Sequence, residues 1–217
     1  MHKKGKFVVF EGIDGSGKTT QFLRLQKRFE EKGIRCSAFD FPRYHDSSFG
    51  ALIGRMLSGE FGTIDKLNPY LAALPYMIDQ AHAAEQIKED LAQGFFVLSN
   101  RYFTSNFGHQ AGKFHGRARK EFCDWLIKAG YKEMGIVKED VVLFFDTPPK
   151  TTKELLTFRK GEKDESEKDR IHQTRSYEAF LEALITFNHW IRVECVRGGE
   201  VLSQEEIHQS VCTILGI

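Results

Sequence analysis

A glycine-rich motif near the N-terminus limits the fold of this chain more than any other feature. The residues from Gly12 to Thr19 read G-x-x-x-x-G-K-T and follow directly on the apolar run from Lys6 to Glu11. That run is rich in β-branched and aromatic side chains and predicts a buried parallel strand. From Lys18 to Glu31 apolar residues recur at helical spacing, so the motif joins a strand to a helix. This order of strand, loop and helix predicts a phosphate-binding loop.

The residue types in the motif suit the binding of a nucleoside triphosphate. Glycines let the backbone wrap closely around phosphates, with N–H groups turned inward and a helix N-terminus beyond them. Lys18 is expected to reach the β- and γ-phosphates, and the hydroxyl of Thr19 is expected to ligate Mg²⁺. The loop predicted to bind ATP comprises Gly12, Ile13, Asp14, Gly15, Ser16, Gly17, Lys18, Thr19 and Thr20.

The rest of the chain alternates between short strands and helices. Further strands are predicted over 35–41, 95–99, 141–146 and around 193–196, and helices over 48–57, 70–93, 118–129, 150–158, 171–190 and 204–215. Such alternation predicts an α/β fold, the three-layer P-loop NTPase fold, with a five-stranded parallel sheet and helices on both faces. No repeat or flexible linker divides the 217 residues, so a single domain over 1–217 is expected.

Charge and cysteine content argue against several classes of protein. Lys and Arg number 31 against 30 Asp and Glu, so the net charge of +1 favours neither nucleic acid nor a membrane surface as a partner. The four cysteines lie far apart without a C-x-x-C pair, which disfavours zinc sites and disulfide frameworks. The first apolar run is too short for a signal peptide or a membrane span, and a cytoplasmic location is expected.

One stretch of the chain, residues 159–170, is almost wholly charged and contains no apolar residue. Such a run cannot pack into a core, and the simpler interpretation is a solvated loop. The alternative interpretation is a charged lid over the phosphates, which would exclude water from the reaction.

Five ordered pieces of sequence carry a resemblance to a known family. They are Phe10 to Thr20, Phe41 to Tyr44, Gly59 to Gly62 with Asn68 to Tyr70, Asn100 to Tyr102 with Ser105–Asn106 and His109–Gln110, and Phe145 to Pro149. In this order and spacing the chain resembles the thymidylate kinases over nearly its whole length. The resemblance implies transfer of phosphate from ATP to dTMP, giving dTDP for deoxynucleotide synthesis. It also implies nucleotides as partners, no nucleic-acid or membrane partner, and a homodimer.

The same resemblance implies a set of residues around the acceptor nucleotide. Asp14 is expected at its deoxyribose or phosphate side, and Arg43 and Arg101 are expected to hold its phosphate, which a guanidinium can bind through two hydrogen bonds. Tyr76 is expected to stack on the thymine ring, and Asn106 is expected to hydrogen-bond the edge of the base. The full set is Asp14, Phe41, Arg43, Tyr44, Tyr76, Gln80, Arg101, Ser105, Asn106, His109 and Gln110.

Catalysis is expected to depend on Lys18, Arg101 and Arg159. The phosphate loop contains no arginine, so Arg159, in the stretch that forms a lid in this family, is expected to meet the charge that develops in transfer. Asn100 replaces the usual aspartate and, with Thr19, is a predicted metal-site residue, while Gln80 replaces an arginine that reads the base. These departures leave open another nucleoside monophosphate kinase, or a nucleotide-binding protein with weak catalysis.

Overall fold

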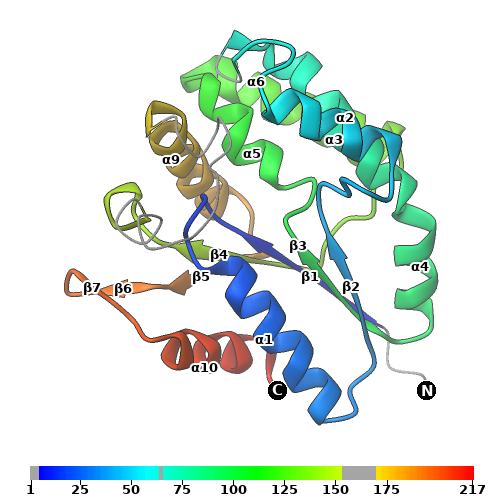
Figure 1. The fold of residues 1–217 in the computed structure, drawn as a ribbon, viewed down its shortest axis with the longest axis vertical. Helices are drawn as coiled ribbons and strands as arrows, with labels where there is room; N and C mark the ends of the chain where they lie inside the picture. Colours follow the sequence, from blue (N-terminus) through cyan, green and yellow to red (C-terminus); the bar gives the residue numbers. More distant parts are fainter. Residues whose placement is uncertain (1–4, 64–65, 153–169) are drawn as a thin grey trace.

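A computed structural model describes residues 5–63, 66–152 and 170–217 of the chain. Its centre is a five-stranded sheet in the order β2-β3-β1-β4-β5 (Figure 1). All neighbouring strands of this sheet are parallel, which confirms the fold class predicted from the sequence. The strands are β1 (Lys6–Glu11), β2 (Cys36–Asp40), β3 (Phe96–Asn100), β4 (Val141–Asp146) and β5 (Trp190–Glu194).

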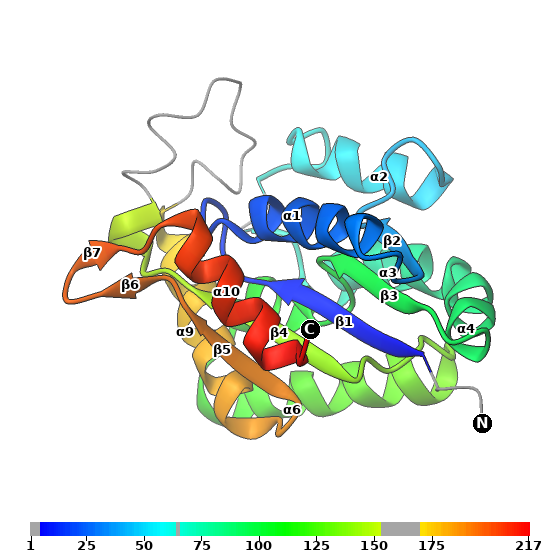
Figure 2. The same cartoon turned by 90° about the horizontal axis from the view of Figure 1, so that it is seen from below.

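Helices cover both faces of the sheet and form the outer layers, as Figures 1 and 2 show. One face is covered by α1 (Lys18–Glu31) and α10 (Gln204–Leu215). The other is covered by α3 (Pro69–His82), α4 (Ala84–Ala92), α5 (Ser105–His109), α6 (Gly116–Ile127) and α9 (Arg170–Thr186), and α2 (Ser48–Leu57) packs against α3. Shorter elements are a 3₁₀ turn (Ala111–Lys113), a π turn (Lys128–Glu133) and the hairpin β6 (Val196–Arg197) with β7 (Glu200–Val201). Within the described ranges no helix is long and apolar enough to cross a membrane.

The two cores follow from the alternation of side chains along β1. Phe7 and Val9 point into the core beneath α3, α5, α6 and α9, whereas Val8 and Phe10 point into the core beneath α1 and α10. All four of these side chains are fully buried. The run from Phe7 to Phe10 is therefore apolar at every position because both faces of the strand are covered.

Two predicted helices end earlier than the sequence pattern indicated. The helix predicted over 70–93 is two helices that meet at Ala83, because α3 packs on α2 while α4 turns to cover β3. The helix predicted over 171–190 ends at Thr186, because Trp190 already belongs to β5, where it pairs with Val142 of β4. The last strand of the sheet therefore lies earlier than the predicted 193–196.

Part of the predicted lid region lies outside the described residues. The helix predicted over 150–158 begins at Pro149 and is described as far as Thr152. Arg159 and the charged stretch over 159–170 lie outside the described residues, apart from Arg170 at the start of α9. Their predicted roles stay predictions from the sequence.

Candidate active site

The carboxyl ends of β1, β2 and β3 bring the predicted site segments to one edge of the sheet. Gly12 follows β1, Arg43 follows β2 after a short turn, and Arg101 follows β3 directly. Ligands bind at this edge in open parallel sheets, because the loops there are free to surround a molecule. The phosphate loop and both predicted phosphate-binding arginines therefore lie together.

The phosphate loop is a tight turn whose geometry requires glycine. Gly12 has φ of 152°, and a side chain there would place its Cβ 2.7 Å from the Ser16 hydroxyl. Gly17 has φ of 88° and precedes the first turn of α1. The loop thus directs the N-terminus of a long helix, with its positive dipole end, toward the space beside it. That space has an open volume of about 1830 Å³ and is lined by residues 14–21 together with Thr147, Cys195 and residues 201–204.

Lys18 lies folded back over the loop. Its ammonium group donates to the Ile13 carbonyl at 3.3 Å and lies 3.9 Å from a carboxylate oxygen of Asp14. The residue is only 5% exposed, so its charge is held close to the loop and away from bulk water. A lysine in this position can bind the phosphates of a nucleotide that occupies the loop.

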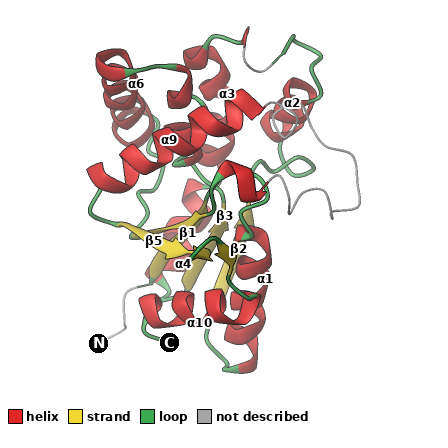
Figure 3. Ribbon diagram, turned by 90° about the vertical axis from the view of Figure 1, so that its left-hand side faces the viewer, coloured by secondary structure: helices red, strands yellow, loops and turns green. Residues whose placement is uncertain are grey.

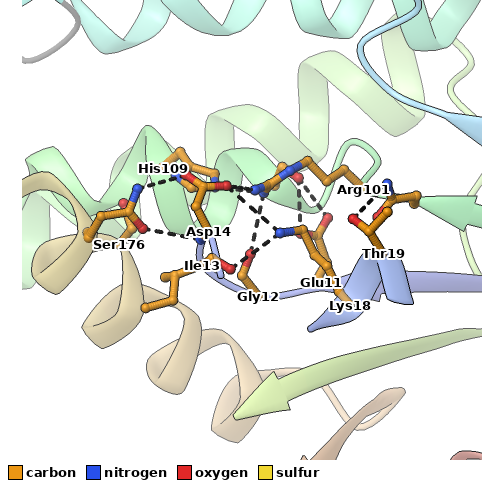
Figure 4. A network of polar contacts seen from close by, with 12 residues as sticks. Glu11, Gly12, Ile13, Asp14, Lys18, Thr19, Arg101, His109 and Ser176 are labelled. Atoms are coloured by element: carbon orange, nitrogen blue, oxygen red, sulfur yellow. Dashed lines mark hydrogen bonds and ion pairs between the residues drawn. The ribbon is translucent and has the colours of Figure 1, made fainter. Parts of the chain in front are cut away.

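Arg101 is at the centre of a polar network that Figure 4 shows. It is a non-glycine residue in the left-handed region, with φ of 60°, a conformation that is rare and clusters at functional sites. Its guanidinium pairs with Asp14 and donates to the Gly12 carbonyl at 3.4 Å and to His109 Nε2 at 2.9 Å. The arginine is thus fixed directly above the phosphate loop.

Glu11 holds the turn that carries Arg101, a role that the sequence analysis missed. This carboxylate is fully buried at the end of β1 and accepts from the backbone N–H of Tyr102 and from the hydroxyls of Thr104 and Ser105. Burial raises the pKa of Glu11, although the charge of Arg101 opposes the shift. The signal in the sequence was an acidic residue at the end of an apolar strand. Ser105, predicted to bind substrate, donates a hydrogen bond from its hydroxyl to the Glu11 carboxylate.

Asp14 joins the phosphate loop to α9. Its backbone N–H donates to Gln173 Oε1 at 3.3 Å, and its carboxylate accepts from Gln173 Nε2 at 2.8 Å. Burial works against ionisation of Asp14, but the charges of Arg101 and Lys18 outweigh it and hold the pKa of this carboxyl below its usual range. Gln173 was missed by the sequence analysis, because nothing in the helical pattern marks which side of α9 faces the loop.

His109 is held between Arg101 and His172 of α9. Since arginine only donates, His109 Nε2 must accept from it, and the proton lies on Nδ1, which faces His172 Nε2 at 3.3 Å. The two imidazole rings are stacked with centroids 5.5 Å apart. Burial, Arg101 and His172 hold the pKa of His109 well below that of an ordinary histidine. His109 is therefore a neutral acceptor that orients Arg101.

Arg43 is oriented by a buried carboxylate of α3. Its Nε donates to Asp79 Oδ1 at 3.0 Å and its backbone N–H donates to Asp79 Oδ2 at 3.0 Å. The Ser47 hydroxyl also donates to Asp79, at 2.6 Å. The guanidinium of Arg43 lies over the ring of Phe41, 5.7 Å from its centroid. Asp79 thus fixes the turn after β2 and orients the guanidinium of Arg43.

A pocket with an open volume of about 650 Å³ lies beside the arginines. The predicted acceptor residues that line it are Asp14, Phe41, Tyr44, Tyr76, Gln80, Arg101, Ser105, Asn106, His109 and Gln110, and Leu57, Tyr102 and His172 join them. Arg43 does not line the pocket and lies at its side, on Asp79.

Three amide side chains, those of Gln80, Asn106 and Gln110, line the pocket beside its aromatic residues. Asn106 Nδ2 donates to the Phe103 carbonyl at 3.0 Å, which leaves its oxygen available to a ligand. The side-chain oxygens of Gln80 and Gln110 are buried and accept no hydrogen bond from the described residues. Buried acceptors without a donor indicate a place that a ligand with matching N–H groups completes.

Oxygen atoms that can ligate a metal ion lie near Thr19, at one end of the polar network around Arg101. Asn100 Nδ2 donates to Thr19 Oγ1 at 3.3 Å and to Asp40 Oδ1 at 2.9 Å. The side-chain oxygen of Asn100 is buried and has no partner among the described residues. A hydroxyl, an amide oxygen and a carboxylate are ligands that suit Mg²⁺ held mainly by phosphates and water. The residues present therefore fit the predicted metal.

Comparisons with known proteins find relatives of one kind. The thymidylate kinase family profile matches residues 10–207. A probable thymidylate kinase of Thermococcus gammatolerans is 34% identical over 214 residues, covering 95% of this chain and 94% of the relative. The thymidylate kinase of Plasmodium falciparum is 26% identical over 211 residues, covering 96% and 89%. The structure of thymidylate kinase from Candida albicans superposes with a TM-score of 0.77 at 24% identity, covering 98% of this chain and 92% of that one.

Proposed function

The chain belongs to the thymidylate kinase family, and from this premise we propose how its site transfers the γ-phosphate of ATP to dTMP, giving ADP and dTDP. One observation carries the proposal: Arg101, fixed by the carboxylate of Asp14, lines both the pocket of the predicted acceptor residues and the space beside the phosphate loop. Arg101 is paired with Asp14 and Arg43 with Asp79. A cationic side chain shared by the two spaces supports direct transfer between two phosphates, which must lie in line.

Each half of the site has its own task in this reaction. The loop from Gly12 to Thr20 binds the phosphates of ATP, and Lys18 meets the charge on the transferred group. Arg43 and Arg101 bind the acceptor phosphate and hold it for in-line attack without a covalent intermediate. The charge of the acceptor phosphate is thereby met by side chains that are already in place, which reduces the cost of reorganisation.

The acceptor base is expected to lie among the amide side chains of the pocket. Tyr76 and Asn106 both line the pocket, which supports stacking of the base on Tyr76 and a hydrogen bond from the N3–H of thymine to the oxygen of Asn106. Cytosine has an unprotonated N3 and an amino group, so it would leave these buried amides without matching partners. Magnesium, when bound with ATP through Thr19 and Asn100, supplies positive charge to the phosphates.

A direct test is the rate of ADP formation with a panel of nucleoside monophosphates. We expect dTMP to be used first, dUMP less well, and dCMP and dGMP far less. Faster turnover of dGMP or dCMP would show that this pocket accepts another nucleotide, the alternative that the Gln80 and Asn100 departures leave open. No turnover with any nucleotide, together with ATP binding, would favour a nucleotide-binding protein with weak catalysis.

We also propose a homodimer in the cytoplasm, as the family resemblance implies. The side chains of Leu71 and Leu74 on α3 are 68% and 37% exposed, which supports an apolar contact between copies of the chain. Light scattering of the wild-type chain and of Leu71→Glu tests the assembly, and fractionation of cells tests the location.

The role of Arg159 remains a sequence-based prediction. It is tested by Arg159→Ala, which should lower kcat more than it raises KM.

A further inference from the structure

Asp40 and Asn100 form a side-chain pair at the ends of neighbouring strands. The two residues are partners in the parallel register of β2 and β3. Asn100 Nδ2 donates to Asp40 Oδ1 at 2.9 Å. A carboxylate can only accept, so it fixes the Asn100 amide with its nitrogen toward Asp40 and its oxygen turned elsewhere. The same nitrogen reaches Thr19 Oγ1 at 3.3 Å, so the pair is linked directly to the phosphate loop.

The other carboxylates near the loop are already engaged. Glu11 accepts from two hydroxyls and a backbone N–H, and Asp14 is paired with Arg101 and bonded to a glutamine. Asp146, at the end of β4, accepts from a tyrosine hydroxyl at 2.6 Å and pairs with an arginine at 3.3 Å. Among the described residues Asp40 is bonded through its carboxylate only to Asn100, and it is exposed at the edge of the sheet.

We propose that Asp40 supplies the carboxylate that holds the hydrated magnesium ion at this site, and that Asn100 links it to Thr19. Mg²⁺ dehydrates reluctantly and is bound by one or two carboxylates together with substrate phosphates. Residue 100 has no charge of its own, but its register partner on the neighbouring strand, Asp40, is acidic. The inference rests on the proposed function, because it requires a magnesium nucleotide in the phosphate loop.

The test measures metal binding rather than turnover. Mn²⁺ serves as the probe, and electron paramagnetic resonance of the free ion gives its affinity for the complex of the full chain with ADP. We expect Asp40→Asn to weaken Mn²⁺ binding at least about tenfold, as loss of an outer-shell ligand partner does. Calorimetry without metal should show unchanged ADP affinity. Asp124→Asn, which removes an exposed carboxylate on α6, is the matched control and should bind Mn²⁺ like the wild type.

A charge swap sharpens the test. Asn100→Asp alone adds a second carboxylate beside the first and should not weaken Mn²⁺ binding, because a divalent cation offsets the repulsion between the two. The double variant Asp40→Asn with Asn100→Asp returns one carboxylate and one amide to the pair and should recover most of the affinity. Wild-type affinity in Asp40→Asn, or a double variant no better than Asp40→Asn, overturns the proposal.

Two further measurements separate this inference from other causes. Thermal unfolding without nucleotide checks each fold, and Asp40→Ser replaces Asp40→Asn if that variant melts early. Turnover of dTMP is measured separately on the wild type. If metal binding depends on Asp40 but the wild type does not turn over dTMP, only the proposed function is overturned. If the wild type turns over dTMP but metal binding does not depend on Asp40, only this inference is overturned.

Discussion

The donor and acceptor halves of the site are built in different ways. The donor half is one continuous loop, in which backbone N–H groups and a helix N-terminus face the phosphates. The acceptor half is assembled from the ends of β2 and β3, from α3 and α5, and from α9. Figure 3 shows α3 and α9 above the sheet, and Figure 4 shows Arg101 and His109 beside Asp14 of the phosphate loop. Its arginines are paired with the carboxylates of Asp79 on α3 and of Asp14 in the phosphate loop. The first half depends on local conformation, and the second depends on ion pairs between distant elements.

The largest effect is expected for Lys18, the cationic side chain of the donor half. Lys18→Ala should lower kcat by a factor on the order of 10² to 10³, because it removes a preorganised charge from the developing phosphoryl oxygens. The fold should persist, since the loop is held by backbone geometry, and thermal unfolding without nucleotide checks this. Turnover close to that of the wild type would contradict the assignment of the loop.

A second prediction tests whether the acceptor half depends on its carboxylates. Asp79→Asn should raise KM for dTMP about ten- to a hundredfold, because Arg43 loses a charged hydrogen-bond acceptor. KM for ATP should stay the same. The matched control is Asp90→Asn, which alters another buried aspartate, on α4, that accepts from Gln86. An equal change in both KM values, or the same change in the control, would show that Asp79 acts on the whole fold.

A third prediction concerns pH and the neutral histidine of the acceptor half. Arg101, Lys18 and His172 face His109 and disfavour its protonation, and only Asp14 favours it. The unfolded chain takes up this proton near pH 6.5 and the folded chain does not, so stability falls as the pH falls. Between pH 7.5 and 5.5 the loss from this group should reach about 1.4 kcal/mol.

Urea unfolding at the two pH values measures this loss. His109→Phe keeps an aromatic ring beside Phe180 and should show a smaller loss of unfolding free energy than the wild type. His115→Gln, which changes an exposed histidine before α6, should behave like the wild type. An equal loss in wild type and His109→Phe would mean that His109 is protonated in the folded state.

The smallest expected effect concerns the methyl group of the acceptor base. The pocket should use dUMP less well than dTMP by on the order of 1 kcal/mol, about fivefold in kcat/KM, because one methyl contact is lost. Steady-state rates with both nucleotides at several concentrations measure this ratio. Equal use of dUMP and dTMP would show that no apolar surface of the pocket contacts the methyl group.

The sequence by itself determined the fold class and the donor half of the site. A strand with an apolar run from Phe7 to Phe10, a glycine-rich turn and a helix are contiguous, so their order and spacing alone predict where phosphate binds. The alternation of later strands and helices predicted the parallel sheet, and its edge brought Arg43 and Arg101 together. These features depend on local conformation and on the period of apolar residues, and a sequence shows both directly.

Only the tertiary structure decided which side chains hold the acceptor half. Gln173 bonds to Asp14 across 159 positions of sequence, and His172 meets His109 across 63. Both come from α9, whose first turns bury polar side chains, so its sequence pattern does not mark the face that meets the loop. The helix break at Ala83 was hidden for a similar reason, since the apolar spacing continues through it. Packing between elements decides such contacts, because it depends on how helices are rotated and placed against the sheet.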